Sequence, residues 1–172
     1  MTSTSHGLPP RLGLDIGGVL VDRAFHDSET SFFGTRPLDT PAVPGCIADL
    51  SPLVGEVFEH RVVLISKAGR RVAARTREWL EHIDFHDRTG IARHDVHFVS
   101  RRSLKSPLCQ ELGVTHFVDD RSEVLDSLET VPHRFLFTGG LGPIAPDVPG
   151  AGVITAGSWP ELAALLRRTA RT

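Results

Sequence analysis

The chain has 172 residues, 40% of them hydrophobic, which suits one domain with a buried core and argues against a disordered protein. The formal net charge is −2 and there is no run of Lys and Arg, so the composition does not indicate a large nucleic-acid surface, although it leaves a smaller one open. With two cysteines, no long apolar run and no signal-peptide core, we expect a cytoplasmic protein with reduced thiols and no membrane contact.

Strand-like apolar segments alternate with amphipathic segments from residue 11 onward. The predicted strands are residues 11–16, 61–66, 95–99, 114–118, 134–137 and 153–155. The predicted helices are residues 46–58, 69–83, 105–112 and 122–130, and a last helix opens with a capping box at residues 158–161. This alternation predicts an α/β fold of three layers: a Rossmann-like parallel sheet of about five to six strands with helices on both faces.

Two segments are predicted to lie outside this framework. Residues 1–10 are polar and proline-rich, so we expect a flexible tail ahead of a single domain over residues 11–172. Residues 22–45 are polar and rich in turn residues, so we expect a loop or small flap insert and no large cap domain. The pair Phe32-Phe33 inside that insert is interpreted either as a substrate flap or as a hydrophobic anchor for the loop.

Polar side chains follow three of the predicted strands. Asp15 ends the first strand just before Gly17-Gly18, Ser66 ends the second, and Asp119-Asp120 ends the fourth. Because the strands are expected to be parallel, these residues should meet at one edge of the sheet. A carboxylate in such a place is costly to bury unless a cation or hydrogen bonds compensate it. Hard divalent cations such as Mg²⁺ prefer oxygen ligands and can hold a phosphate beside a carboxylate nucleophile.

These residues, in this order, resemble the motifs of the haloacid dehalogenase-like superfamily, and more narrowly its phosphatases. The first motif corresponds to Asp15-Ile16-Gly17-Gly18-Val19-Leu20 and the second to Leu64-Ile65-Ser66. The third corresponds to Lys105 at a helix start, and the fourth to Phe117-Val118-Asp119-Asp120. Each motif alone is weak, but four in the right order on the right elements are fairly specific.

The resemblance implies a Mg²⁺-dependent phosphatase acting on a small-molecule or nucleotide phosphomonoester. Asp15 would be the nucleophile that forms an aspartyl-phosphate, Ser66 would bind a phosphate oxygen, and Lys105 would balance the charge. The metal ligands would be Asp15, the backbone carbonyl of Gly17, and Asp120, with Asp119 acting behind them or through a water.

One position departs from the family pattern. The family has a second Asp that protonates the leaving oxygen and later activates water, and this chain has Gly17 in its place. General acid–base catalysis contributes roughly 10²–10⁴-fold, so the departure favours either a slow phosphatase or an impaired relative that only binds or regulates. Candidate replacement acids close in sequence are Asp22, His26 and Asp27.

Several residues keep a second interpretation. Asp15 suits an Asx turn, and Ser66 and Asp119-Asp120 suit helix capping. Lys67, the only other lysine besides Lys105, is the alternative phosphate-balancing cation or a substrate contact. The four histidines between residues 82 and 97 match no known zinc spacing, and Gly17-Gly18 falls short of the glycine pattern of a Rossmann nucleotide site.

The expected absence of a large cap leaves the site open. An open site accepts a large substrate or is closed by a partner subunit, so a homo-oligomer is one expectation. Candidate substrate-binding residues are Ser66, Lys67, Arg36 and Arg70, with Arg71 as a further cation for a second anionic group.

Overall fold

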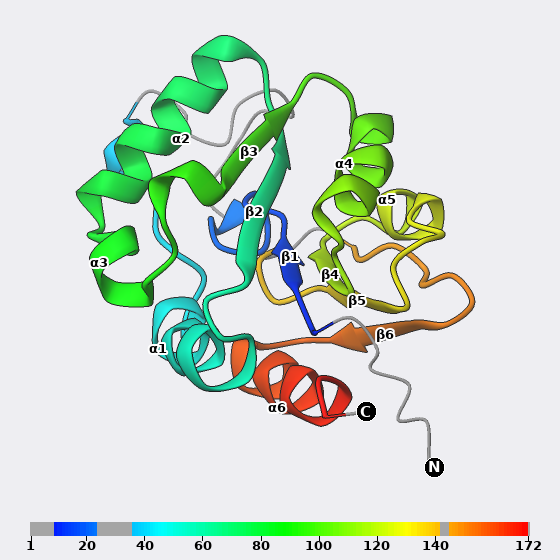
Figure 1. Cartoon of the computed structure of the whole chain (residues 1–172). Coiled ribbons are helices and arrows are strands. Elements are labelled where there is room, and N and C mark those ends of the chain that lie inside the picture. Colours follow the sequence, from blue (N-terminus) through cyan, green and yellow to red (C-terminus); the bar gives the residue numbers. More distant parts are fainter. Residues whose placement is uncertain (1–8, 24–35, 142–144, 172) are drawn as a thin grey trace.

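A single six-stranded sheet forms the centre of the molecule (Figure 1). The computed structural model describes residues 9–23, 36–141 and 145–171. All strand pairs are parallel, in the order β3-β2-β1-β4-β5-β6. The strands are β1 (Leu12–Leu14), β2 (Val62–Lys67), β3 (Val96–Val99), β4 (His116–Asp119), β5 (His133–Phe137) and β6 (Val153–Ala156). The predicted parallel α/β sheet is confirmed.

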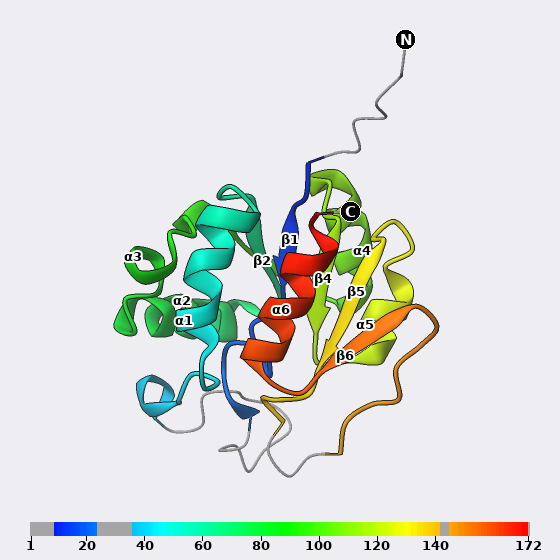
Figure 2. The same cartoon turned by 90° about the horizontal axis from the view of Figure 1, so that it is seen from below.

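Helices cover both faces of this sheet, as Figures 1 and 2 show. One face packs against α1 (Cys46–Pro52), α2 (Arg70–His82), α3 (Phe85–Thr89) and α6 (Trp159–Thr169). The other face packs against α4 (Lys105–Leu112) and α5 (Ser122–Ser127). Successive strand residues point to opposite faces, so Leu64 lies in the first core and its neighbours Val63 and Ile65 lie in the second. This two-sided burial explains the almost continuous apolar runs of the central strands.

Several element boundaries differ from the prediction. The first strand stops at Leu14 because the carbonyl of Ile16 accepts the N–H groups of Leu20 and Val21, which turns the chain. The predicted helix over 46–58 divides after Pro52, which lacks the N–H of a regular helical residue, into α1 and a short π-helix over Leu53–Val57.

Other differences involve short segments. Helix α3 was not predicted, because its five residues are too few to show a helical period, and its start is set by Asp84 in the left-handed region (φ 53°). Helix α5 ends at Ser127, before the predicted residue 130. Single turns of 3-10 helix, also not predicted, lie at Pro37–Asp39, Arg93–Asp95 and Arg102–Leu104.

The predicted insert at 22–45 is described only at its two ends. Val21 forms an antiparallel bridge with Ala42, and the Val43 N–H donates to the Leu20 carbonyl, which holds the exit of the insert against the first loop. The residues Phe32-Phe33, His26 and Asp27 lie outside the described residues, as do residues 1–8 of the predicted tail. Within the described ranges, no helix combines the length and apolar character needed to cross a bilayer.

Candidate active site

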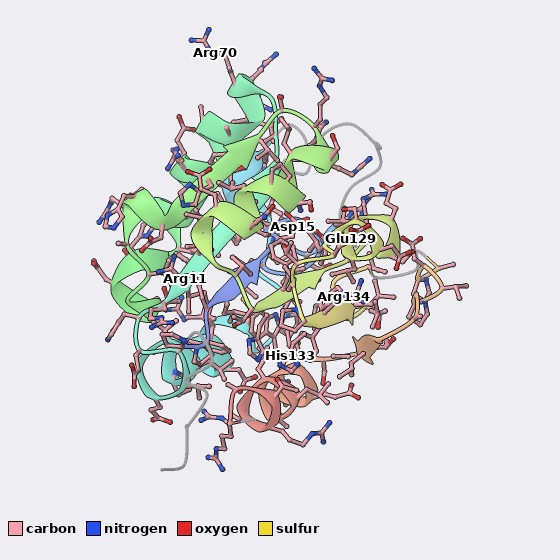
Figure 3. The ribbon with its side chains drawn as sticks, turned by 45° about the vertical axis from the view of Figure 1, so that its right-hand side comes forward. Arg11, Asp15, Arg70, Glu129, His133 and Arg134 are labelled. Atoms are coloured by element: carbon pink, nitrogen blue, oxygen red, sulfur yellow. The ribbon has the colours of Figure 1, made fainter. Side chains whose placement is uncertain are left out.

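Most of the predicted site residues meet at the carboxyl edge of the central strands, while Arg36 and Arg70 do not. Leu14 of β1 is in register with Leu64 of β2 and with Val118 of β4, so the residues that follow these positions lie side by side. The Asp15 N–H donates to the Val118 carbonyl at 2.9 Å, which fixes Asp15 beside Asp119. Figure 3 labels Asp15 at the centre of the molecule. The order of the strands, β2-β1-β4, therefore assembles segments that are about 50 residues apart in the chain.

The loop after β1 depends on Gly18. Its φ of 74° lies in the left-handed region, and a Cβ built there would overlap the carboxylate of Asp120. The Gly18 N–H donates to the Val21 carbonyl at 2.8 Å and closes the loop. Gly17 does not have a positive φ. The backbone thus requires a glycine at position 18, whereas it places no such demand on position 17.

Three carboxylates and one lysine form the centre of the site. Asp15, Asp119 and Asp120 are all buried, and each offers a carboxylate oxygen that lies within 4.8 Å of the others. The Lys105 Nζ lies 2.7 Å from Asp119 Oδ2 and 3.2 Å from Asp15 Oδ1. Lys105 is only 1% exposed, and it is the first residue of α4, as predicted. Of the two lysines in the chain, Lys105 is therefore the one that pairs with Asp15.

A second cation, Arg23, enters the site and was not predicted. Its Nη1 lies 2.6 Å from Asp120 Oδ2, and its backbone N–H donates to the Gly140 carbonyl at 2.9 Å. No motif points to Arg23. Only the number of charges in the sequence points to a further cation: burying three neighbouring carboxylates at one strand edge requires more positive charge than a single lysine provides.

The charges in this cluster shift one another's pKa values. Burial alone lowers the pKa of Lys105, but the carboxylates of Asp15 and Asp119 outweigh it, so that the pKa lies above its ordinary value. Burial, followed by the charge of Asp15, raises the pKa of Asp119 well above the usual range of a carboxyl group. The pKa of Asp120 is raised for the same two reasons, with Arg23 acting in the opposite direction. Burial is thus the main cause that disfavours the charged forms of Asp119 and Asp120.

This donor set fits a hard divalent cation. The three ligand atoms are carboxylate oxygens, which Mg²⁺ prefers over nitrogen or sulfur ligands. Counted formally, three carboxylates against Lys105 and Arg23 leave one negative charge that a bound cation would compensate. Among the residues that the structure describes, no other group of three acidic, His or Cys ligands comes this close together, so a zinc site built from the histidines finds no support there.

Ser66 and Lys67 lie on the β2 side of the site. Ser66 is buried at the end of β2, and Lys67 is exposed. A small cavity separates them from the first loop, with the lining residues Ile16, Gly17, Val21, Ser66, Lys67, Ala68, Val72 and Thr76. No carboxylate or imidazole lines this cavity within the described part of the chain, so Ser66, Lys67 and Thr76 are the groups with exchangeable side-chain protons next to Gly17.

The other candidate residues lie further out. Arg36 is exposed and pairs with Asp39 at 3.7 Å. Arg70, at the start of α2, points outward at the periphery of the molecule, well away from Asp15 (Figure 3). Asp22 follows the first loop, and its N–H donates to the Pro41 carbonyl at 3.0 Å. None of these three residues is part of the carboxylate cluster.

The fold has a counterpart among solved structures, whereas the sequence does not match known families. No protein-family model and no curated protein match this chain. A crystal structure of a provisionally assigned haloacid dehalogenase-like hydrolase from Burkholderia xenovorans LB400 superposes with a TM-score of 0.59 and 16% sequence identity. The match covers 91% of this chain and 97% of that one. Together with the parallel six-stranded sheet, it shows that the chain has the haloacid dehalogenase-like fold.

Proposed function

We propose that this chain is a Mg²⁺-dependent phosphohydrolase that cleaves a phosphate monoester by transferring the phosphoryl group to Asp15. The observation that carries the proposal is the contact of Lys105 with both Asp15 and Asp119 inside a cluster of three buried carboxylates. A structural ion pair would need one carboxylate per lysine. A site that must also attract a cation and then a dianionic phosphate needs the surplus negative charge that this cluster has.

Asp15 would act as the nucleophile. Its Oδ1 accepts hydrogen bonds from the Ile16 N–H at 2.8 Å and faces Lys105, which orients the carboxylate. Among the described residues, none donates a hydrogen bond to Oδ2, so this oxygen keeps its lone pairs for attack. Attack would form a bond between Oδ2 and phosphorus and break the ester P–O bond, and the leaving oxygen would take a proton from solvent to depart as the alcohol. Water would later hydrolyse the aspartyl-phosphate to release inorganic phosphate and restore the carboxylate.

The neighbouring groups would stabilise charge during this transfer. Ser66 at the end of β2 would donate its hydroxyl to a phosphate oxygen, and Lys105 would offset charge on Asp15 and on the transferred group. Asp15, Asp119 and Asp120 would hold the cation, with the carbonyl of Gly17 as a further predicted ligand. The cation, when bound, would reduce the repulsion between the carboxylate and the phosphate.

The test is metal-dependent release of phosphate. Wild-type protein is expected to hydrolyse p-nitrophenyl phosphate with Mg²⁺ and to lose this activity in EDTA. Asp15→Asn is expected to abolish turnover, because the amide is a poor nucleophile. Asp87→Asn, which removes an exposed carboxylate on α3, is the matched control and should keep it. Full turnover by Asp15→Asn would refute the proposal.

A second candidate function is binding without turnover, and Gly17 favours it. No residue in the described lining next to Gly17 has the carboxylic acid that would protonate a leaving alkoxide. This candidate predicts that Mg²⁺ and inorganic phosphate bind, as measured by calorimetry, while no phosphomonoester is hydrolysed. Hydrolysis that Asp15→Asn abolishes would rule it out.

A further inference from the structure

Exposed cationic side chains follow the carboxyl ends of β2 and β3, with Lys67 next to the site and Arg70 at the periphery of the molecule. We call Lys67, Arg70, Arg71, Arg101 and Arg102 the basic rim; all five are exposed. They come from residues 66–77 and 96–110, two segments that together contain no Asp or Glu. Parallel pairing joins the segments, because Lys67 is in register with Val99 and the Ala68 N–H donates to the Val99 carbonyl. The rim is thus a product of the fold, in a chain whose net charge is −2.

Most of the rim has no acidic partner. Within the described part of the chain, no carboxylate forms an ion pair with Lys67, Arg70, Arg71 or Arg101, while Arg102 pairs with Glu123 at 3.3 Å. Elsewhere, exposed Arg93 lies 2.6 Å from Glu81, whereas exposed Arg88, Arg168 and Arg171 form no ion pair within the described residues; the rim differs from these in having four such cations on two neighbouring segments. The rim therefore has positive charge available for a partner outside the chain.

Helix stability does not account for these residues. Arg70 and Arg71 occupy the first turn of α2, and that turn contains no acidic residue. Cations at a helix N-terminus oppose the helix dipole and therefore weaken the helix slightly when they are exposed. Residues that disfavour their own helix and lack partners point to a function in binding.

The rim is continuous with the site. Lys67 lines the same small cavity as Gly17 and Ser66. Neighbouring strands are about 4.8 Å apart, so the loop after β3 lies about 10 Å from the loop after β1. A ligand with a single phosphate at Asp15 would leave the β3 side of the rim uncovered. The rim matches a ligand with further negative charges about 10 Å from the reacting phosphate.

The surface chemistry favours a nucleic acid over a protein. Protein interfaces have an apolar core, and among the described residues the only exposed large hydrophobic side chain in these two segments is Leu104. A surface that is charged without an apolar centre suits a chain of regularly spaced phosphates. Building on the proposed function, we infer that the substrate is the terminal phosphate of a single-stranded nucleic acid whose following phosphates lie along the basic rim.

The experiment compares binding and hydrolysis in matched variants. Arg71→Gln with Arg101→Gln removes two rim charges, and Arg168→Gln with Arg171→Gln removes two exposed charges at the end of α6, at the opposite edge of the sheet (Figure 2). Binding of a fluorescent, terminally phosphorylated 12-nucleotide strand is followed by anisotropy across a salt series, in EDTA. The rim variant is expected to bind at least tenfold more weakly, with its salt slope reduced by about 1.4, because each single-strand phosphate contact contributes about 0.7. The control variant should bind like wild type.

Hydrolysis then separates this inference from the proposed function. The ratio of kcat/KM for the phosphorylated strand to that for p-nitrophenyl phosphate is expected to exceed 10 in wild type and to fall at least tenfold in the rim variant. Equal binding by the two double variants, or binding too weak to measure in wild type, overturns the inference even if p-nitrophenyl phosphate is hydrolysed. Rim-dependent binding without hydrolysis of either substrate supports the binding surface and refutes the phosphohydrolase.

Discussion

Replacing Lys105 by Met tests whether the carboxylate cluster depends on its buried cation. Met has a similar length and removes only the charge that pairs with Asp15 and Asp119 at 3.2 and 2.7 Å. Removing one partner of a buried ion pair costs about 3–5 kcal/mol, because the remaining charge is left without compensation. For a chain of this size, about 2–4 °C of Tm is lost per kcal/mol, so we expect Tm to fall by roughly 6–20 °C.

The assay is thermal and urea unfolding in EDTA. The control is Lys67→Met, which removes the other lysine of the chain from an exposed position at the same edge of the sheet and should change the free energy of unfolding by no more than about 0.5 kcal/mol. The double variant Lys105→Met with Asp119→Asn should be more stable than the sum of the single effects predicts, by about 0.5–3 kcal/mol, since it removes both members of the closest pair.

Two results would refute this reasoning. The first is equal unfolding midpoints for Lys105→Met and Lys67→Met, which would mean that the buried ammonium contributes nothing that an exposed one does not. The second is strict additivity in the double variant, which would mean that Lys105 and Asp119 do not interact. Both measurements are made without metal, so they examine the chain's own charges.

Three further predictions concern the first loop, the cation and the far edge of the sheet. Gly18→Ala should lower the free energy of unfolding by more than about 1 kcal/mol, because residue 18 has a φ of 74° and a Cβ there would overlap Asp120. Gly17→Ala, at a residue without a positive φ, should lower it by much less; urea unfolding measures both. Mg²⁺ at about 100 times its Kd should stabilise wild type by about 2.7 kcal/mol in thermal unfolding, and Asp120→Asn should lose most of that gain. Burial, reinforced by His133, lowers the pKa of His116 to about 4. Below pH 6.5 the imidazole of His116 is therefore protonated in the unfolded chain but stays neutral in the folded chain until about pH 4. The free energy of unfolding should therefore fall by up to about 3 kcal/mol between pH 7 and pH 4 in wild type, and by less in His116→Phe, which lacks the titrating group. The same fall in His116→Phe as in wild type would show that His116 is not the cause.

The sheet and the cluster could be predicted because both follow from local patterns. Apolar runs of four to six residues mark strands that are buried on both faces, and a polar residue directly after such a run marks the carboxyl edge. Ser66 follows such a run of four residues, and Asp15 and Asp119 follow shorter apolar stretches, so their convergence needed only the assumption of parallel strands. Lys105 was found through its match to the third motif of the resembled family, a lysine at a helix start, and the structure places it 2.7 Å from Asp119.

Arg23 and the basic rim could not be predicted in the same way. Arg23 reaches Asp120 because the chain turns at Ile16 and is held to Gly140, and no pattern in the sequence specifies that contact. The rim joins two segments that are about 30 residues apart, so neither forms a charge run. Both features depend on which loops become neighbours, and that depends on strand order and register more than on composition.

The contrast between Gly17 and Gly18 separates what the fold needs from what the reaction needs. Gly18 has a positive φ and touches Asp120, so any side chain there would displace a carboxylate of the cluster. Gly17 does not have a positive φ, so its backbone conformation does not explain the missing acid at this position. Restoring it with Gly17→Asp should therefore leave the fold intact. It should also speed hydrolysis of alkyl phosphates more than aryl phosphates, since a poor leaving group gains most from protonation. If the rates for alkyl and aryl phosphates rise by the same factor, an acid at position 17 does not protonate the leaving group. Lys67 and Ser66, which line the adjoining cavity, are then the next residues to substitute.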